Sequence, residues 1–193
     1  MNYDEWARQS RHGLRAAMLL TMVVLLGACS SGDSPSRESS ALNIGKIVYF
    51  VDAPVSGLPY RVDGGELRRT GRGGAVDLGS GRTVTFVLGG RRIFINNPPQ
   101  IFTPADIYPD DRANSLVRLL MAIDDDGNPQ NGINVADAVV EAANAAALAE
   151  TDLIGEAFDT SASASFASAN SRSGSVPSAA QAQAHLDQTI AAI

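Results

Sequence analysis

The sequence predicts an α+β fold: a small antiparallel β-sandwich or barrel followed by three or four packed helices. Two observations predict it. Between residues 46 and 102, short β-branched and aromatic runs alternate with glycine-containing turns, as they do in all-β units. From residue 103 onward, apolar residues recur at helical spacing and capping residues precede them. We therefore expect a β module at residues 46–102, with helices after it.

The β module should contain several short strands. Residues 47–51 form a continuous β-branched and aromatic run, which predicts a buried strand. A second run, at residues 58–62, ends at Asp-Gly-Gly, which is a hairpin signal. Polar and apolar residues alternate over residues 83–88, so the apolar ones should share one buried face. A Gly-Gly turn then leads into a strand at residues 91–95.

Residues 103–158 are expected to form a helical segment with an acidic loop inside it. Thr103 is a hydroxyl cap that is followed by proline at the first helical position. A longer helix is expected over residues 113–123, where leucines fall on one face. Asn134 should cap a third helix that starts at Val135 and continues to about residue 149, because its alanine-rich body favours helix.

The C-terminal part is expected to be a linker and a docking helix. Residues 159–177 are rich in serine and alanine, which predicts a solvated linker. A Ser-Ala-Ala-Gln capping box then opens a helix at residues 178–193. The apolar stripe that should dock on the domain consists of Leu186, Ile190 and Ile193. His185 has no acidic partner or nucleophile motif nearby in the sequence, so we expect a helix-surface or domain contact for it.

The first 28 residues have the layout of a bacterial lipoprotein signal peptide. A basic stretch is followed by an apolar run and then by Leu-Gly-Ala-Cys, which ends at Cys29, the only cysteine. The apolar run, residues 16–28, is shorter than the roughly 20 apolar residues of a transmembrane helix. We expect lipidation of Cys29, with palmitate among the acyl chains. The alternative is a plain secretory signal with a chance cysteine.

The expected lipid defines a compartment and the start of the mature chain. Residues 29–45 are polar and serine-rich, so they should form a flexible tether between the lipid and the domain. Serine rather than aspartate follows Cys29, which favours the outer membrane of a Gram-negative bacterium. The expected location is therefore the cell envelope, with the membrane as a partner through lipidated Cys29.

Composition argues against two classes of function. The formal net charge is −6, and it becomes −7 without residues 1–28, which hold three arginines and two acidic residues. An acidic chain repels phosphate backbones, so we expect no nucleic-acid partner. Without the signal peptide His185 is the only histidine, and neither a Gly-x-Ser-x-Gly elbow nor a phosphate loop is present. We therefore expect no catalytic residues and no enzyme.

An acidic segment at residues 124–133 is the one motif that resembles a site. Its Asp-x-Asp-x-Asn pattern places three oxygen-bearing side chains around a tight loop, and Ca²⁺ binds six to eight oxygens. The candidate metal ligands are Asp124, Asp126, Asn128 and, one turn into the next helix, Asp137. The loop departs from an EF-hand, because Pro129 and Val135 occupy the positions of the turn glycine and the bidentate glutamate.

Two interpretations of this loop remain open. In the first, Ca²⁺ offsets the repulsion between adjacent carboxylates at the negative end of a helix, with a weak affinity of roughly 10⁻⁴ to 10⁻³ M. In the second, the loop is a structural linker between helices, in which Gly127 and Asn131-Gly132 satisfy the dihedral angles of turns.

Four strings occur in order along the chain: Asp-Ala-Pro-Val-Ser-Gly at 52–57, Thr-Val-Thr-Phe-Val-Leu-Gly-Gly at 83–90, Thr-Pro-Ala-Asp at 103–106 and Asp-Asp-Asp-Gly-Asn-Pro-Gln-Asn-Gly-Ile at 124–133. With them, the chain resembles a group of proteobacterial surface lipoproteins and adhesin-like proteins over roughly residues 46–137 and 178–193. The resemblance implies a transthyretin-like, or carboxypeptidase-regulatory-like, β module that serves as a scaffold. The sequence departs from the group at residues 72–81, which puts the strand implied there in doubt.

These observations predict a lipid-anchored surface lipoprotein of the envelope that acts as a non-enzymatic binding or structural module, with adhesion as one such role. Its expected partner, besides the membrane, is an envelope protein or surface ligand that the sequence does not identify. The alternative is an accessory subunit of an envelope transport or assembly system that acts through protein contacts.

Overall fold

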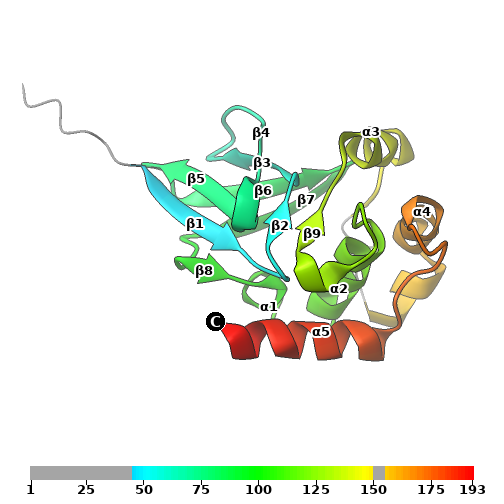
Figure 1. The fold of residues 1–193 in the computed structure, drawn as a ribbon. Coiled ribbons are helices and arrows are strands. Elements are labelled where there is room, and N and C mark those ends of the chain that lie inside the picture. Colours follow the sequence, from blue (N-terminus) through cyan, green and yellow to red (C-terminus); the bar gives the residue numbers. More distant parts are fainter. Residues whose placement is uncertain (1–44, 150–154) are drawn as a thin grey trace, which may run out of the picture. The chain divides into compact units, whose positions relative to one another are not determined.

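The computed structural model describes residues 45–149 and 155–193, and these residues form an α+β fold as predicted (Figure 1). The strands form three sheets with mostly antiparallel pairing, and five α-helices accompany them within this part of the chain. The predicted signal peptide, the predicted lipidation site Cys29 and nearly all of the predicted tether lie outside the described residues. Across the described ranges, no helix combines the length and the apolar character needed to cross a bilayer.

The first sheet has three strands in the order β5-β1-β8. Strand β1 (Lys46–Phe50) pairs antiparallel with β5 (Ala75–Gly79) and parallel with β8 (Ile101–Phe102). The predicted strand at residues 47–51 is present, but it is buried on one face only: Val48 and Phe50 are buried, whereas Ile47 is exposed. The region 72–81 does contain a strand, β5.

The second sheet has four antiparallel strands in the order β4-β3-β6-β7. These are β4 (Arg68–Arg69), β3 (Pro59–Val62), β6 (Thr83–Leu88) and β7 (Arg91–Asn96). The alternation predicted for residues 83–88 is confirmed, because Val84, Phe86 and Leu88 are all buried. The Gly-Gly turn brings β6 and β7 into register, with Leu88 opposite Arg91.

The inner faces of the two sheets pack on each other through aromatic side chains. The ring centroid of Phe50 lies 4.7 Å from that of Phe86 on the second sheet and 5.3 Å from that of Phe102 on the first. All three side chains are at most 1% exposed. Rings of this size contribute much of the buried apolar area, so this cluster is the centre of the β module's core.

A third, two-stranded sheet joins the β module to the helical part. Strand β2 (Val55–Ser56) runs parallel to β9 (Ile133–Asn134), which directly follows the acidic loop. Gly57 has a φ of +79°, and a Cβ there would lie 2.4 Å from the carbonyl oxygen of Val135. Only glycine permits this close approach, so the acidic loop is fixed to the β module at this point.

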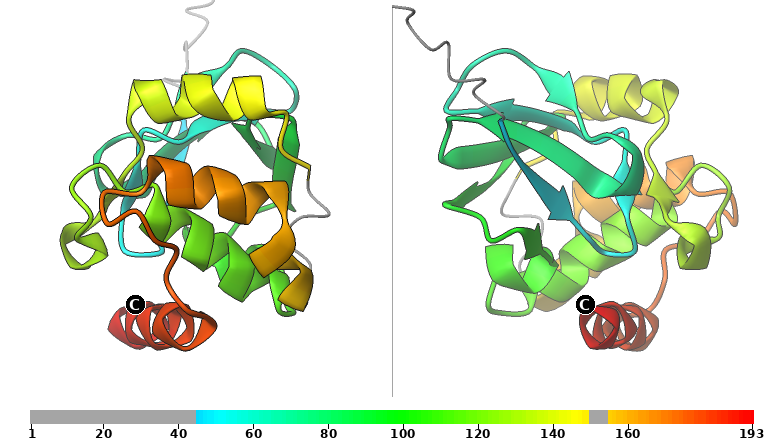
Figure 2. Two further views of the ribbon diagram at one scale, coloured as in Figure 1. Left: turned by 90° about the vertical axis from the view of Figure 1, so that its right-hand side faces the viewer. Right: turned by 60° about the vertical axis from the view of Figure 1, so that its left-hand side comes forward.

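The helices form a layer beside the sheets (Figure 2). The α-helices are α1 (Pro104–Ile107), α2 (Arg112–Ala122), α3 (Asp137–Ala146), α4 (Ala162–Asn170) and α5 (Ala179–Ala192), and the 3₁₀ turns are η2 (Arg72–Gly74), η3 (Pro129–Asn131) and η5 (Gly155–Thr160). The cap expected at Thr103 and the capping box expected at Ser178 are present, and Thr103 also forms a capping box with Asp106. Helix α2 is the most buried of the five and packs against both α4 and α5.

The prediction of a solvated linker at residues 159–177 is wrong. This segment contains helix α4, whose cap residue Ser161 accepts a hydrogen bond from the backbone N–H of Ala164 (3.1 Å). Phe166 and Ala167 are buried against the rest of the domain. Serine and alanine are common in linkers, but their small side chains also allow close packing of helices, and the composition did not distinguish the two.

Two other helix predictions need correction. Helix α3 begins at Asp137 rather than Val135, because Asn134 belongs to β9 and does not cap the helix. Helix α5 docks through a face rotated from the predicted stripe, since Ile190 and Ile193 are 45% and 58% exposed. Its buried residues are Ala182, His185, Leu186 and Thr189.

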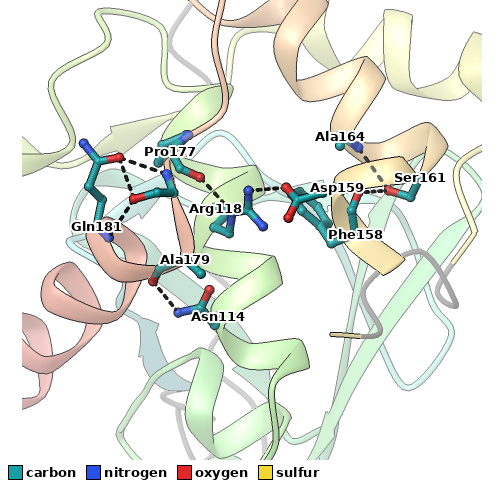
Figure 3. A network of polar contacts seen from close by, with 10 residues as sticks. Asn114, Arg118, Phe158, Asp159, Ser161, Ala164, Pro177, Ala179 and Gln181 are labelled. Carbon is teal, nitrogen blue, oxygen red and sulfur yellow. Dashed lines mark hydrogen bonds and ion pairs between the residues drawn. The ribbon is translucent and has the colours of Figure 1, made fainter. Parts of the chain in front are cut away.

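The first turn of α5 is fastened to α2 by a network of polar contacts around Arg118 (Figure 3). The Arg118 guanidinium donates to the carbonyl of Pro177 (2.7 Å), pairs with the carboxylate of Asp159 and lies 4.7 Å from the ring centroid of Phe158. Asn114 donates to the carbonyl of Ala179 (2.9 Å). Arg118 lowers the pKa of Asp159 by hydrogen bonding to its carboxylate.

Candidate cation site in the acidic loop

The acidic loop leaves the end of α2 and is closed by backbone pairing with the residues that follow it. Asp124 forms an antiparallel bridge with Val135. The backbone N–H of Asp125 donates to the carbonyl of Asn134 (3.0 Å), and the N–H of Asn134 donates to Asp124 Oδ1 (2.9 Å). The two ends of the loop are thus held together, and β9 fixes them to the β module through its pairing with β2.

Asp126 organises the inner turn of the loop. Its Oδ1 accepts from the backbone N–H of Asn128 and its Oδ2 accepts from the side-chain amide of Asn131, each at 2.8 Å. These hydrogen bonds, that from Asn131 foremost, lower the pKa of Asp126. Gly127 has a φ of +74°, which lets the chain turn tightly between Asp126 and Asn128. Asp126 is therefore held by two hydrogen bonds within an exposed turn.

Asp124 is the unusual member of the loop. It is only 1% exposed, and its Oδ2 is buried and has no hydrogen-bond partner. Burial is the largest cause of a raised pKa for Asp124, and the nearby carboxylate of Asp126 raises it further. A buried carboxylate oxygen without a partner costs free energy, and a second negative charge beside it adds to the cost. A cation between the two carboxylates would remove both costs.

The loop borders a hollow of about 490 Å³ at the junction of the β module and the helical part. Its lining includes Asp124, Asp125 and Asp126 on one side and Ser56 and Arg72 on the other. The carboxylate of Asp125 already has two partners outside the hollow's other acidic residues. It accepts from the side-chain amide of Asn134 (3.1 Å) and lies 3.5 Å from the guanidinium of Arg172.

The structure brings two of the four predicted metal ligands to this hollow. Asp124 and Asp126 both line it, and Asn128 contributes its backbone N–H to Asp126. Asp137, the first residue of α3, is engaged elsewhere: its Oδ1 lies 2.7 Å from Arg69 Nη2 on strand β4. Within the described ranges, no group of three or more His, Cys, Asp or Glu side chains is placed to hold a metal ion. Amide, carbonyl and water oxygens would have to complete the coordination of any Ca²⁺ bound here.

A second buried pair, which the sequence did not reveal, lies close by. His185 was expected to lack an acidic partner, but its Nε2 lies 3.5 Å from Oδ1 of Asp52. Asp52 is fully buried and His185 is 5% exposed. The two residues come from opposite ends of the domain's sequence, in the turn after β1 and in α5, so no local spacing could have paired them. The one available signal was an aspartate directly after a strand with buried residues.

No family model, curated protein or solved structure matches this chain. The assignment of a function therefore depends on the geometry of the loop and on the sequence of the N-terminus.

Proposed function

We propose that this protein is a lipid-anchored surface lipoprotein of the envelope that acts as a non-enzymatic binding or structural module, with a divalent cation stabilising its acidic loop. The observation that carries the cation site is the unpartnered, buried Oδ2 of Asp124 beside the carboxylate of Asp126. Calcium is the expected ion, because it prefers carboxylate and amide oxygens and tolerates irregular coordination.

The position of the loop supports a structural role for the ion. Asp124 and Asp126 lie between α2 and β9, and β9 pairs with β2 of the β module. An ion held here would bind the folded protein and not the unfolded chain, so it would stabilise the junction of the two parts by mass action. The proposed partner, besides the membrane, is an envelope protein or surface ligand.

The N-terminus supports the anchor. The run Leu-Gly-Ala-Cys ending at Cys29 follows an apolar stretch, as in lipoprotein signals. Growth with radiolabelled palmitate should label the wild-type chain, and Cys29→Ser should abolish the label. A labelled Cys29→Ser variant, or an unlabelled wild type, would rule out this anchor.

Calorimetric titration of the full chain with CaCl₂ tests the cation site. The expected result is binding with a dissociation constant of roughly 10⁻⁴ to 10⁻³ M. Asp124→Asn should abolish the heat, whereas the matched variant Asp137→Asn should not, since Arg69 already engages that carboxylate. If the wild type gives no heat and no rise in melting temperature at millimolar Ca²⁺, the loop is a linker without an ion.

A further inference from the structure

The pair formed by Asp52 and His185 is buried without being satisfied. Both carboxylate oxygens of Asp52 and the Nε2 of His185 are buried and have no hydrogen-bond partner of acceptable geometry. Asp52 lies in a two-residue turn closed by a bridge between Val51 and Pro54. The other turn residue, Ala53, has a φ of +46°, which is unfavourable for a residue with a Cβ. The folded protein therefore contains both buried polar atoms without hydrogen-bond partners and an unfavourable backbone angle at this turn, and α5 covers the turn.

The acidic loop contacts this pair directly. Gln130, in the 3₁₀ turn η3, places its Nε2 3.3 Å from Nδ1 of His185. The side-chain amide of Gln130 is thus in hydrogen-bond contact with Nδ1 of His185, while Nε2 of the same ring lies 3.5 Å from Oδ1 of Asp52. The next residue of the turn, Asn131, donates to Asp126 (2.8 Å). One short turn thus holds a loop carboxylate on one side and the buried histidine on the other.

We propose that cation binding in the acidic loop and docking of helix α5 reinforce each other, with Gln130 as the connecting residue. This inference rests on the cation site proposed above and assigns to it a regulated element. A cation that holds Asp124 and Asp126 together fixes the turn that follows Asp126. Because η3 has only three residues, fixing Asn131 also fixes Gln130 in its position against His185.

The docking of α5 beyond its first turn depends on few other polar contacts. The hydroxyl of Thr189 accepts from the backbone N–H of Ala53 (3.2 Å), so this contact is made to the strained turn itself. A small hollow of about 210 Å³ lies beside this contact and is lined by Ala53, Gln130, His185 and Thr189, among others. Water can therefore reach this end of the interface when the helix loosens, and it would then solvate Asp52. The energy gained by solvating Asp52 favours undocking, and the contact from Gln130 opposes it.

Linkage makes the coupling reciprocal. If Ca²⁺ favours the docked helix by a given factor, the docked helix raises the affinity for Ca²⁺ by the same factor. A coupling of about tenfold lies within the usual range. Removing Gln130 should break the coupling without removing either the ion's carboxylates or the helix.

Hydrogen–deuterium exchange of the full chain in detergent, with and without CaCl₂, tests this proposal. In the wild type, Ca²⁺ should slow exchange of the amides at the buried face of α5 by about tenfold. Gln130→Ala should still bind Ca²⁺ by calorimetry but lose this protection. Gln188→Ala is the matched control, because Gln188 is an exposed glutamine of α5 that lines the same small hollow. It should behave as the wild type does.

The outcomes separate this inference from the cation site. If Ca²⁺ binds the wild type and α5 exchanges at an unchanged rate, the coupling is overturned and the site remains. The same conclusion follows if Gln130→Ala keeps the full protection. If the wild type gives no calorimetric heat with Ca²⁺, the site itself is overturned, and the coupling with it. As a reciprocal check, His185→Ala should weaken Ca²⁺ affinity by about the factor seen in exchange.

Discussion

Helix α5 is held on the domain at two places that differ in how their buried charges are satisfied. At its first turn, Arg118 is 7% exposed and has a carbonyl, a carboxylate and an aromatic face as partners. Further along, Asp52 is fully buried beside His185 with no hydrogen bond to its carboxylate. Both regions bury an ionisable group against the same helix, but only the first supplies that group with partners that offset the cost of removing it from water.

This difference separates a contact that only stabilises the fold from a responsive contact, whose stability changes with the surrounding conditions. A buried charge whose partners are complete stabilises one arrangement over a wide range of conditions. A buried carboxylate without partners makes the local structure sensitive to anything that supplies a proton, a cation or water. The responsive end of α5 is also the end that contacts the acidic loop through Gln130.

The largest expected effect is a dependence of stability on pH that comes from Asp52. Burial raises the pKa of Asp52 to about 7, whereas an unfolded aspartate titrates near about 3.9. Between these pH values the folded protein holds a proton that the unfolded chain has lost. The free energy of unfolding should therefore fall as pH rises from about 4 to about 7, by at most about 4 kcal/mol. Asp52→Asn should remove this fall.

Urea denaturation at a series of pH values from 4 to 8 measures this effect. The control is Asp187→Asn, since Asp187 is an exposed carboxylate on the same helix. It should keep the wild-type dependence on pH. If Asp52→Asn shows the wild-type slope as well, Asp52 is not the proton-binding group and the contrast between the two ends of α5 fails.

The sequence predicted the parts of this molecule that follow from local patterns. The face of β6, the cap at Thr103 and the capping box at Ser178 are confirmed, because alternation and caps act over a few residues. Contacts between distant segments were missed. Nothing near His185 in the sequence indicates Asp52, and nothing near Asp137 indicates that Arg69 would engage it. The candidate site was found from its acidic spacing, but its buried member could be recognised only in the fold.

The second prediction concerns the first turn of α5, where Arg118 has a full set of partners. Arg118→Ala removes the contacts with Asp159, Phe158 and Pro177 and should lower the free energy of unfolding by about 3 kcal/mol. Arg68→Ala is the matched control, because its ion pair with Asp77 is half exposed and should cost less than about 1 kcal/mol. Equal losses for the two variants, measured by urea denaturation, would show that Arg118 is no more than a surface charge.

The third prediction concerns the cation site in the absence of its ion. With EDTA present, Asp124→Asn should raise the free energy of unfolding by about 1 kcal/mol, because it removes a buried carboxylate that lacks a partner for Oδ2. At a Ca²⁺ concentration about ten times the dissociation constant, the wild type should gain about 1.4 kcal/mol and the variant nothing. Thermal unfolding with and without Ca²⁺ measures both effects. A variant that is destabilised in EDTA would mean that the loop carboxylate is already satisfied without an ion.

The smallest expected effect comes from a change in the first turn of α5 alone, away from the end of the helix that contacts Gln130. Ser178→Ala removes the cap that accepts from Gln181 and should cost about 1 kcal/mol, as loss of an N-cap usually does. Amide exchange should then increase in the first turn of α5, while Ca²⁺ affinity stays unchanged, because Gln130 contacts the helix at His185 rather than at its start. His185→Ala, by contrast, should weaken Ca²⁺ binding as measured by calorimetry. If Ser178→Ala weakens Ca²⁺ binding as much as His185→Ala does, the whole helix responds as one rigid unit, and the two ends differ in their partners but not in their behaviour.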